Sequence, residues 1–124
     1  MRKVLLVDDN LTQLRIREAV IRGAGFDVAS ALTAESALDI LRASTSDHSV
    51  AIVITDHVMP GISGTEFVQE LRNIDLSVPV VVLSGLAEAE AEYEGQNITF
   101  RLKPCAPSEM ISLVQRLFTD TDAA

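Results

Sequence analysis

The chain has 124 residues, of which 48% are hydrophobic and 23% are charged, which is enough apolar mass for one folded core. Its formal net charge of −8 argues against direct binding to nucleic acid, because a polyanion would be repelled. No apolar run reaches the roughly 20 residues of a membrane span, the chain starts without a secretory signal pattern, and Cys105 is the only cysteine. We therefore expect a cytoplasmic domain without an internal disulfide that contacts neither nucleic acid nor membrane.

Short apolar runs alternate with longer amphipathic segments along the chain. Five runs have the β-branched and aliphatic composition of strands, namely residues 3–7, 27–30, 50–55, 80–84 and 98–102. The first, third and fourth are apolar almost throughout, as strands covered on both faces are. The alternation predicts an α/β domain over residues 1–119, with a parallel sheet between two layers of helices. Residues 120–124 are predicted to be a disordered tail.

Five segments between and after these strands are predicted to be helices. Three have recognisable start signals: an N-cap at Thr33, a capping box at Ser63, and Pro107 in a first turn. In the first helix we expect a packing face of small and apolar residues, namely Ile16, Ala19, Val20 and Gly23. The fourth, over residues 86–94, alternates alanine and glutamate. Only Leu86, Ala89 and Tyr93 make an apolar stripe there, and we expect the segment to be short or mobile, with alanines that contribute little packing.

Polar side chains follow four of the five predicted strands at their carboxyl ends. They are Asp8 and Asp9 after the first strand, Asp56 after the third, Ser84 at the end of the fourth, and Lys103 after the fifth. In an open parallel sheet these ends lie along one edge, where ligands bind. Two carboxylates about 4 Å apart repel by roughly 4 kcal/mol at an effective dielectric near 20. A divalent cation with oxygen ligands relieves that repulsion, and Mg²⁺ suits a shallow, hydrated site.

With these residues in this order, the chain resembles the receiver domains of two-component response regulators over about residues 2 to 118. The resemblance implies a doubly wound five-stranded parallel sheet of order 2-1-3-4-5 with five helices, the flavodoxin-like architecture. It implies that Asp56 is the phosphoryl acceptor and that Ser84 and Lys103 bind the phosphoryl oxygens. The Mg²⁺ ligands that it implies are Asp8, Asp9, Asp56 and the backbone carbonyl of Val58.

The resemblance also implies a switch. Ser84 and Phe100, the aromatic residue three positions before the lysine, would be the switch residues, and the Lys103–Pro104 peptide would be cis in a tight turn. Phosphorylation would draw the Ser84 hydroxyl toward the phosphoryl group and let the Phe100 ring turn inward. This would change the face formed by the fourth helix, the fifth strand and the fifth helix.

A carboxylate at a rigid strand tip suits phosphoryl transfer, which depends mainly on positioning and charge neutralisation. We therefore expect the domain to be a self-modifying substrate and not a turnover enzyme. Val58 and Leu86, two residues after Asp56 and Ser84, are apolar and offer nothing to hold an attacking water. This predicts slow self-dephosphorylation.

The expected phosphoryl donor is a sensor histidine kinase or a histidine phosphotransfer protein. The output is expected to pass through a downstream effector partner or the remainder of a longer chain. Leu11 and Leu14 lie away from the predicted packing face of the first helix, so they are either peripheral core or a patch where the donor docks. Simple packing is the favoured interpretation of Cys105, and His57 is expected to contact a neighbouring helix because it points away from Asp56.

Three other functions are weighed against phosphoryl acceptance. An unphosphorylated scaffold receiver would not need the complete set of acids, hydroxyl and lysine. A flavin phosphate-binding module would need a phosphate cradle where Asp8 and Asp9 place anions. A Mg²⁺-dependent aspartyl phosphatase usually has a second acid two residues after its nucleophile, where this chain has Val58.

Overall fold

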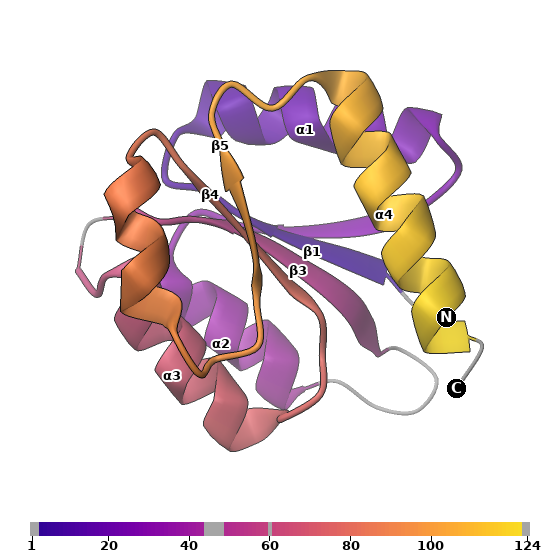
Figure 1. Cartoon of the computed structure of the whole chain (residues 1–124). Coiled ribbons are helices and arrows are strands. Elements are labelled where there is room, and N and C mark those ends of the chain that lie inside the picture. The colour runs from indigo at the N-terminus through magenta and orange to yellow at the C-terminus, as the bar shows by residue number, and fades with distance from the viewer. Residues whose placement is uncertain (1–2, 44–48, 60, 123–124) are drawn as a thin grey trace.

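The computed structural model describes residues 3–43, 49–59 and 61–122, which form a central sheet between two layers of helices (Figure 1). The five strands are all parallel and are ordered β2-β1-β3-β4-β5, as predicted. Their bounds are β1 Lys3–Val7, β2 Asp27–Ala31, β3 Val50–Asp56, β4 Val80–Ser84 and β5 Thr99–Leu102. Strands β3 and β4 are buried throughout, which explains why their sequences are apolar as far as Ile54 and Leu83.

The helices cover both faces of the sheet (Figure 1). Helices α1 (Leu11–Gly23) and α4 (Pro107–Asp122) lie on one face, and α2 (Ala34–Arg42), α3 (Gly64–Ile74) and the 3₁₀ helix η1 (Ala87–Tyr93) lie on the other. The five predicted helical segments are thus present, the fourth of them as a short 3₁₀ helix. None of these described helices is long and apolar enough to cross a membrane.

The helix starts follow the capping signals in the sequence. The Thr33 hydroxyl accepts a hydrogen bond from the Ser36 N–H at 3.1 Å, and the Ser63 hydroxyl accepts one from the Glu66 N–H at 3.1 Å. Pro107 is the first residue of α4, where its missing N–H has no cost. Helix α4 continues to Asp122, past the boundary expected at residue 119, and residues 123–124 of the predicted tail lie outside the described residues.

Alternation along the strands divides the apolar residues into two cores. In β1, Leu5 and Val7 belong to the core under α2 and α3, whereas Val4 and Leu6 belong to the core under α1 and α4. The fully buried Phe67 of α3 fills the first of these cores. The sheet is therefore held from both sides, which fixes the ends of its central strands.

The predicted packing face of α1 is wrong except for Val20, which is partly buried against the core under α1 and α4. The helix buries Leu14, Glu18 and Ile21, which recur at the spacing of one helical face, whereas Ile16 is 57% exposed. The charge of Glu18 hid this face in the sequence. Leu14 lies in the core and is only 3% exposed, so it cannot belong to an exposed docking patch, and only Leu11, at 50% exposed, remains accessible.

The packing expected of the fourth helical segment is also corrected. Helix η1 buries Ala89 and Tyr93, which are 2% and 3% exposed, and Tyr93 joins the core beneath α3. These are two of the three residues of the predicted apolar stripe, whereas the third, Leu86, is 50% exposed. The expectation that the alanines contribute little packing is therefore wrong for Ala89.

Candidate functional site

Two buried carboxylates lie at the carboxyl ends of neighbouring central strands. Asp56 is the last residue of β3 and is 3% exposed, and Asp8 directly follows β1 and is 1% exposed. The backbone holds both tips: the Asp8 N–H donates to the Ala31 carbonyl at 3.1 Å, and the His57 N–H donates to the Leu83 carbonyl at 2.9 Å. The acids predicted at these strand ends therefore converge on rigid backbone.

Asp9, which is exposed, completes a group of three acids. One carboxylate oxygen from each of Asp8, Asp9 and Asp56 lies within 4.8 Å of the other two. An all-oxygen set at this spacing suits a hard divalent cation such as Mg²⁺. The donor chemistry of the three acids thus fits the predicted metal.

The protonation of Asp8 reflects this crowding. Burial raises the pKa of the Asp8 carboxyl to about 6, and a side-chain hydrogen bond with Asp56 and the charge of Asp56 act in the same direction. The Asn10 N–H, 2.9 Å from Asp8 Oδ1, and the Arg17 guanidinium oppose the increase in pKa. The two carboxylates therefore still repel each other when no divalent cation lies between them.

Lys103 lies beside the predicted acceptor. Its Nζ atom is 2.9 Å from Asp56 Oδ1, and its backbone N–H donates to the Ser84 carbonyl at 2.8 Å. The Lys103–Pro104 peptide is cis, as predicted. The ammonium is about one-third exposed, so it can reach both Asp56 and a group arriving from solvent.

The two predicted switch residues, Ser84 and Phe100, are each held by a neighbour other than Asp56. Ser84 is buried, and its hydroxyl accepts from the Leu86 N–H at 3.0 Å and donates to the Leu86 carbonyl at 3.3 Å. Phe100 is half-buried and packs against Tyr93, with ring centroids 6.4 Å apart. The Ser84 hydroxyl is thus hydrogen-bonded to the loop that follows β4.

Arg17 of α1 was missed by the sequence prediction. Its Nη1 atom is 2.7 Å from Asp8 Oδ2 and 3.3 Å from Asp56 Oδ1, and its side chain is 13% exposed. The strand pattern indicates charges only at strand ends, whereas this guanidinium reaches the edge of the sheet from about two turns inside a helix. Its spacing of seven residues from the N-cap Asn10 is the signal that could have indicated it.

A second polar network lies on the opposite side of β3. His57 Nδ1 is 2.6 Å from the Tyr93 hydroxyl, and His57 Nε2 is 3.6 Å from Glu92 Oε2. The prediction that His57 points away from Asp56 and contacts a neighbouring helix is confirmed, and that helix is η1. Burial raises the pKa of Tyr93 to about 12, so the phenol stays protonated and can donate to the imidazole.

This network connects the acceptor strand to the predicted switch residue. Tyr93 contacts both the His57 ring, at 5.5 Å between centroids, and the Phe100 ring. The space is tight, because a Cβ on Gly64 would overlap the Tyr93 hydroxyl and lie 2.8 Å from the His57 carbonyl. The residue after Asp56 is therefore joined to β5 through one buried tyrosine.

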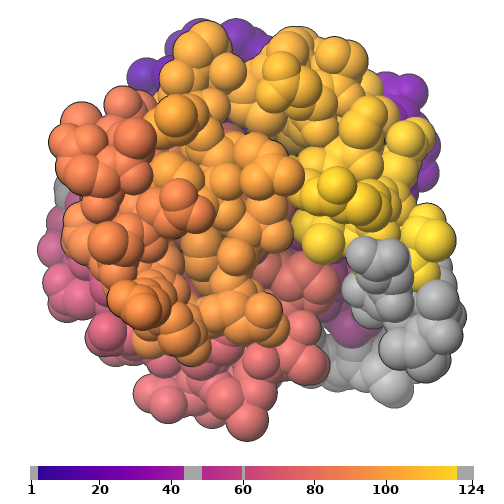
Figure 2. All heavy atoms as spheres, viewed as in Figure 1, coloured from indigo at the N-terminus to yellow at the C-terminus, as the bar shows by residue number. Residues whose placement is uncertain are grey.

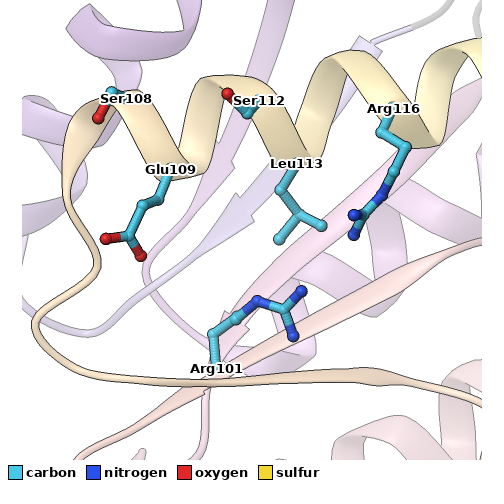
Figure 3. A pocket seen from close by; sticks show the side chains of 6 residues that line it. All are labelled: Arg101, Ser108, Glu109, Ser112, Leu113 and Arg116. Atoms are coloured by element: carbon cyan, nitrogen blue, oxygen red, sulfur yellow. The ribbon is translucent and has the colours of Figure 1, made fainter.

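The surface next to this network is a single face formed by η1, β5 and α4 (Figure 2). Between β5 and α4 lies a hollow of about 340 Å³, in which Arg101 extends from the strand toward Arg116 of the helix (Figure 3). The other residues around it are Ser108, Glu109, Ser112 and Leu113. None of the predicted site residues lines this hollow, so it is separate from the acidic site.

The comparisons with known proteins agree on one family. Residues 4–115 match the response regulator receiver domain. The chain is 34% identical over 118 residues to the transcriptional regulatory protein PrrA of Mycobacterium tuberculosis, covering 93% of this chain and 49% of that protein. It is 29% identical over 125 residues to the probable transcriptional regulator ycf27 of Porphyridium aerugineum, covering 98% and 50%. The chain thus spans about half the length of these curated relatives.

Among solved structures, a response regulator receiver domain protein from Clostridium thermocellum superimposes with a TM-score of 0.89 at 22% identity. The match covers 99% of this chain and 98% of that one. At this identity the likeness supports the fold alone.

Proposed function

Because this chain belongs to the response regulator receiver domains of two-component signal transduction, we propose that it accepts a phosphoryl group on Asp56. The observation that carries the proposal is the surroundings of this carboxylate. It is almost fully buried at the end of β3, with an ammonium 2.9 Å away and two further acids beside it. Receiver domains are generally not turnover enzymes, and here the modified group would be the domain's own side chain.

The Asp56 carboxylate acts as the nucleophile. One of its oxygens forms a bond to phosphorus while the bond from phosphorus to the donor breaks, and the donor atom leaves with the electron pair. The transition state for such a transfer is loose, so the protein contributes chiefly by positioning and by neutralising charge. Strand β3, held between β1 and β4, keeps the acceptor in line with the incoming group.

The neighbouring side chains stabilise the transferred group. Lys103 can donate hydrogen bonds from its ammonium to the phosphoryl oxygens, since it already lies at Asp56 Oδ1 and is partly exposed. The residues that would hold Mg²⁺ are Asp8, Asp9, Asp56 and the backbone carbonyl of Val58. When bound, Mg²⁺ would offset the negative charge of the phosphoryl oxygens and orient them.

The switch would begin at Ser84. Its hydroxyl is bonded to the Leu86 backbone and can exchange these contacts for a phosphoryl oxygen. Phe100, which now packs against Tyr93, would then turn inward into the space that the Ser84 hydroxyl leaves, which would alter the face made by η1, β5 and α4 (Figure 2). One hydrogen bond contributes about 0.5–1.5 kcal/mol, whereas a swing from 1:99 to 99:1 needs about 5.5 kcal/mol. We therefore expect a partial shift in population.

The donor would be a sensor histidine kinase or a histidine phosphotransfer protein. Two relatives are named as transcriptional regulators, and this chain covers about half of each. We propose that the signal leaves through the remainder of a longer chain or through a separate effector partner. The charge of −8 on this domain is unfavourable for direct contact with nucleic acid.

Intact-mass spectrometry tests phosphoryl acceptance. The wild type, Asp56→Asn and the control Asp39→Asn, which changes an exposed acid on α2, are incubated with acetyl phosphate and Mg²⁺. The wild type and the control should each gain one phosphoryl group, and Asp56→Asn none. Chelation of the metal should slow the gain. A wild type that gains no mass from acetyl phosphate or from any histidine-phosphorylated donor would instead support the unphosphorylated scaffold.

A further inference from the structure

The guanidinium of Arg17 lies between two of the three acids that would hold the metal. A single nitrogen, Nη1, is 2.7 Å from Asp8 Oδ2 and 3.3 Å from Asp56 Oδ1. The side chain is only 13% exposed, so solvent screens these contacts weakly. Arg17 is thus an internal cation bridging the acceptor carboxylate and one of its neighbours.

The charges at this edge of the sheet balance when a divalent cation takes the place of Arg17, but not when both are present. Three carboxylates face the ammonium of Lys103 and the guanidinium of Arg17, which leaves one negative charge when all are ionised. Replacing Arg17 by a divalent cation brings the balance to zero, whereas keeping both leaves an excess positive charge. Arg17 already occupies two of the three carboxylates that the metal would need, those of Asp8 and Asp56.

The structure offers Arg17 a place to move. Its Nη2 atom is already 3.4 Å from the Gln13 side-chain oxygen, one turn earlier on α1. Beside it is a hollow of about 440 Å³, lined by Gln13, Arg17, Lys103, Pro104, Cys105 and Met110. A rotation of the side chain can therefore place the guanidinium outside the acids without any movement of α1.

We propose that Arg17 is a built-in competitor of the divalent cation and swings away from Asp8 and Asp56 when the metal binds. The inference rests on the metal site of the proposed function and adds a regulation to it. Metal affinity is reduced by the fraction of molecules in which Arg17 bridges the acids. At low Mg²⁺ the acceptor stays paired and is a poorer substrate, so Arg17 sets the Mg²⁺ concentration that the domain requires.

Isothermal titration calorimetry with Mg²⁺, in the absence of a phosphoryl donor, tests this inference. We compare the wild type with Arg17→Gln and with the control Arg22→Gln, which removes the same charge from the exposed end of α1. Arg17→Gln should bind Mg²⁺ at least about tenfold more tightly than the wild type, and Arg22→Gln within about twofold, because distant exposed charges are screened. Arg17→Lys, which keeps the charge on a smaller group, should fall between the wild type and Arg17→Gln.

Equal affinity for Arg17→Gln and Arg22→Gln would overturn the inference and leave the proposed function standing. A failure of every protein to bind Mg²⁺ would overturn both the inference and the proposed metal site. A measurement on the wild type alone guards against a poorly folded variant. The NMR signal of the Arg17 side-chain N–H should shift as Mg²⁺ saturates the protein, and an unchanged signal at saturation would also overturn the inference.

Discussion

The crowded acids should make the metal-free protein less stable than it would be without one of them. We consider Asp8→Asn, which removes one negative charge and keeps nearly the same shape. Burial and Asp56 raise the pKa of Asp8 from 3.8 to about 6, so ionising this group costs more in the folded chain than in the unfolded one. The variant avoids this cost, and at neutral pH without metal it should be more stable than the wild type.

The size and sign of this change in stability follow from proton linkage. The change from 3.8 to about 6 corresponds to about 3 kcal/mol, at 1.36 kcal/mol for each tenfold change in proton affinity. Between these values the folded state binds more protons than the unfolded state, so wild-type stability falls as pH rises from about 4 to about 6 and then stays level with respect to Asp8. We expect Asp8→Asn to raise the free energy of unfolding by about 2–3 kcal/mol above about pH 7, and most of this increase to be absent near pH 4.

Urea unfolding of both proteins in a metal chelator, at several pH values, measures the difference. The exposed control Asp39→Asn should change stability by less than about 0.5 kcal/mol at each pH. Saturating Mg²⁺ should reverse the order of stabilities, because the wild type keeps a ligand that Asp8→Asn lacks. A variant that is no more stable than the wild type at neutral pH, or whose gain does not depend on pH, would refute this reasoning.

Three further substitutions have defined outcomes. Gly64→Ala should lower the free energy of unfolding in urea by about 1–3 kcal/mol, because the added Cβ would overlap the Tyr93 hydroxyl. The control Gly23→Ala, where nothing lies within 4 Å of the added Cβ, should be neutral or slightly stabilising. Equal effects of the two substitutions would contradict the packing argument. Arg72→Met should cost about 2–4 kcal/mol, since this buried guanidinium donates to four backbone carbonyls, and a neutral result would mean that water replaces them. Val58→Asn should shorten the half-life of the phosphorylated form by giving an attacking water a partner, and an unchanged half-life in a mass time course would count against this role.

Most of the site could be predicted because its residues follow local patterns. The apolar runs fix where β1 and β3 end, and so they place Asp8 and Asp56 at one edge of the sheet. Capping side chains mark the starts of α2 and α3. These features depend on neighbours in the sequence, and strand order followed from the resemblance to a known family.

The remaining features depend on contacts between distant residues. Arg17 reaches Asp56 across 39 positions, and Tyr93 reaches His57 across 36, so both contacts depend on how distant elements pack. Arg72 is charged yet buried, because its guanidinium donates hydrogen bonds to backbone carbonyls in two loops, one before β4 and one after η1. Glu18 conceals the packing face of α1 for a similar reason: its carboxylate pairs with Arg15 at 3.4 Å and Arg22 at 3.5 Å while the residue itself is 7% exposed.

Chemical mapping of the phosphorylated residue tests the central claim most directly. Borohydride reduces an acyl phosphate of aspartate to homoserine, so peptide mass spectrometry of the phosphorylated and reduced protein identifies the acceptor. We predict that Asp56 alone is converted, and only after incubation with Mg²⁺ and a phosphoryl donor. Conversion at Asp8 or Asp9, or a phosphoryl group that resists reduction because it is attached to His57, would contradict the assignment.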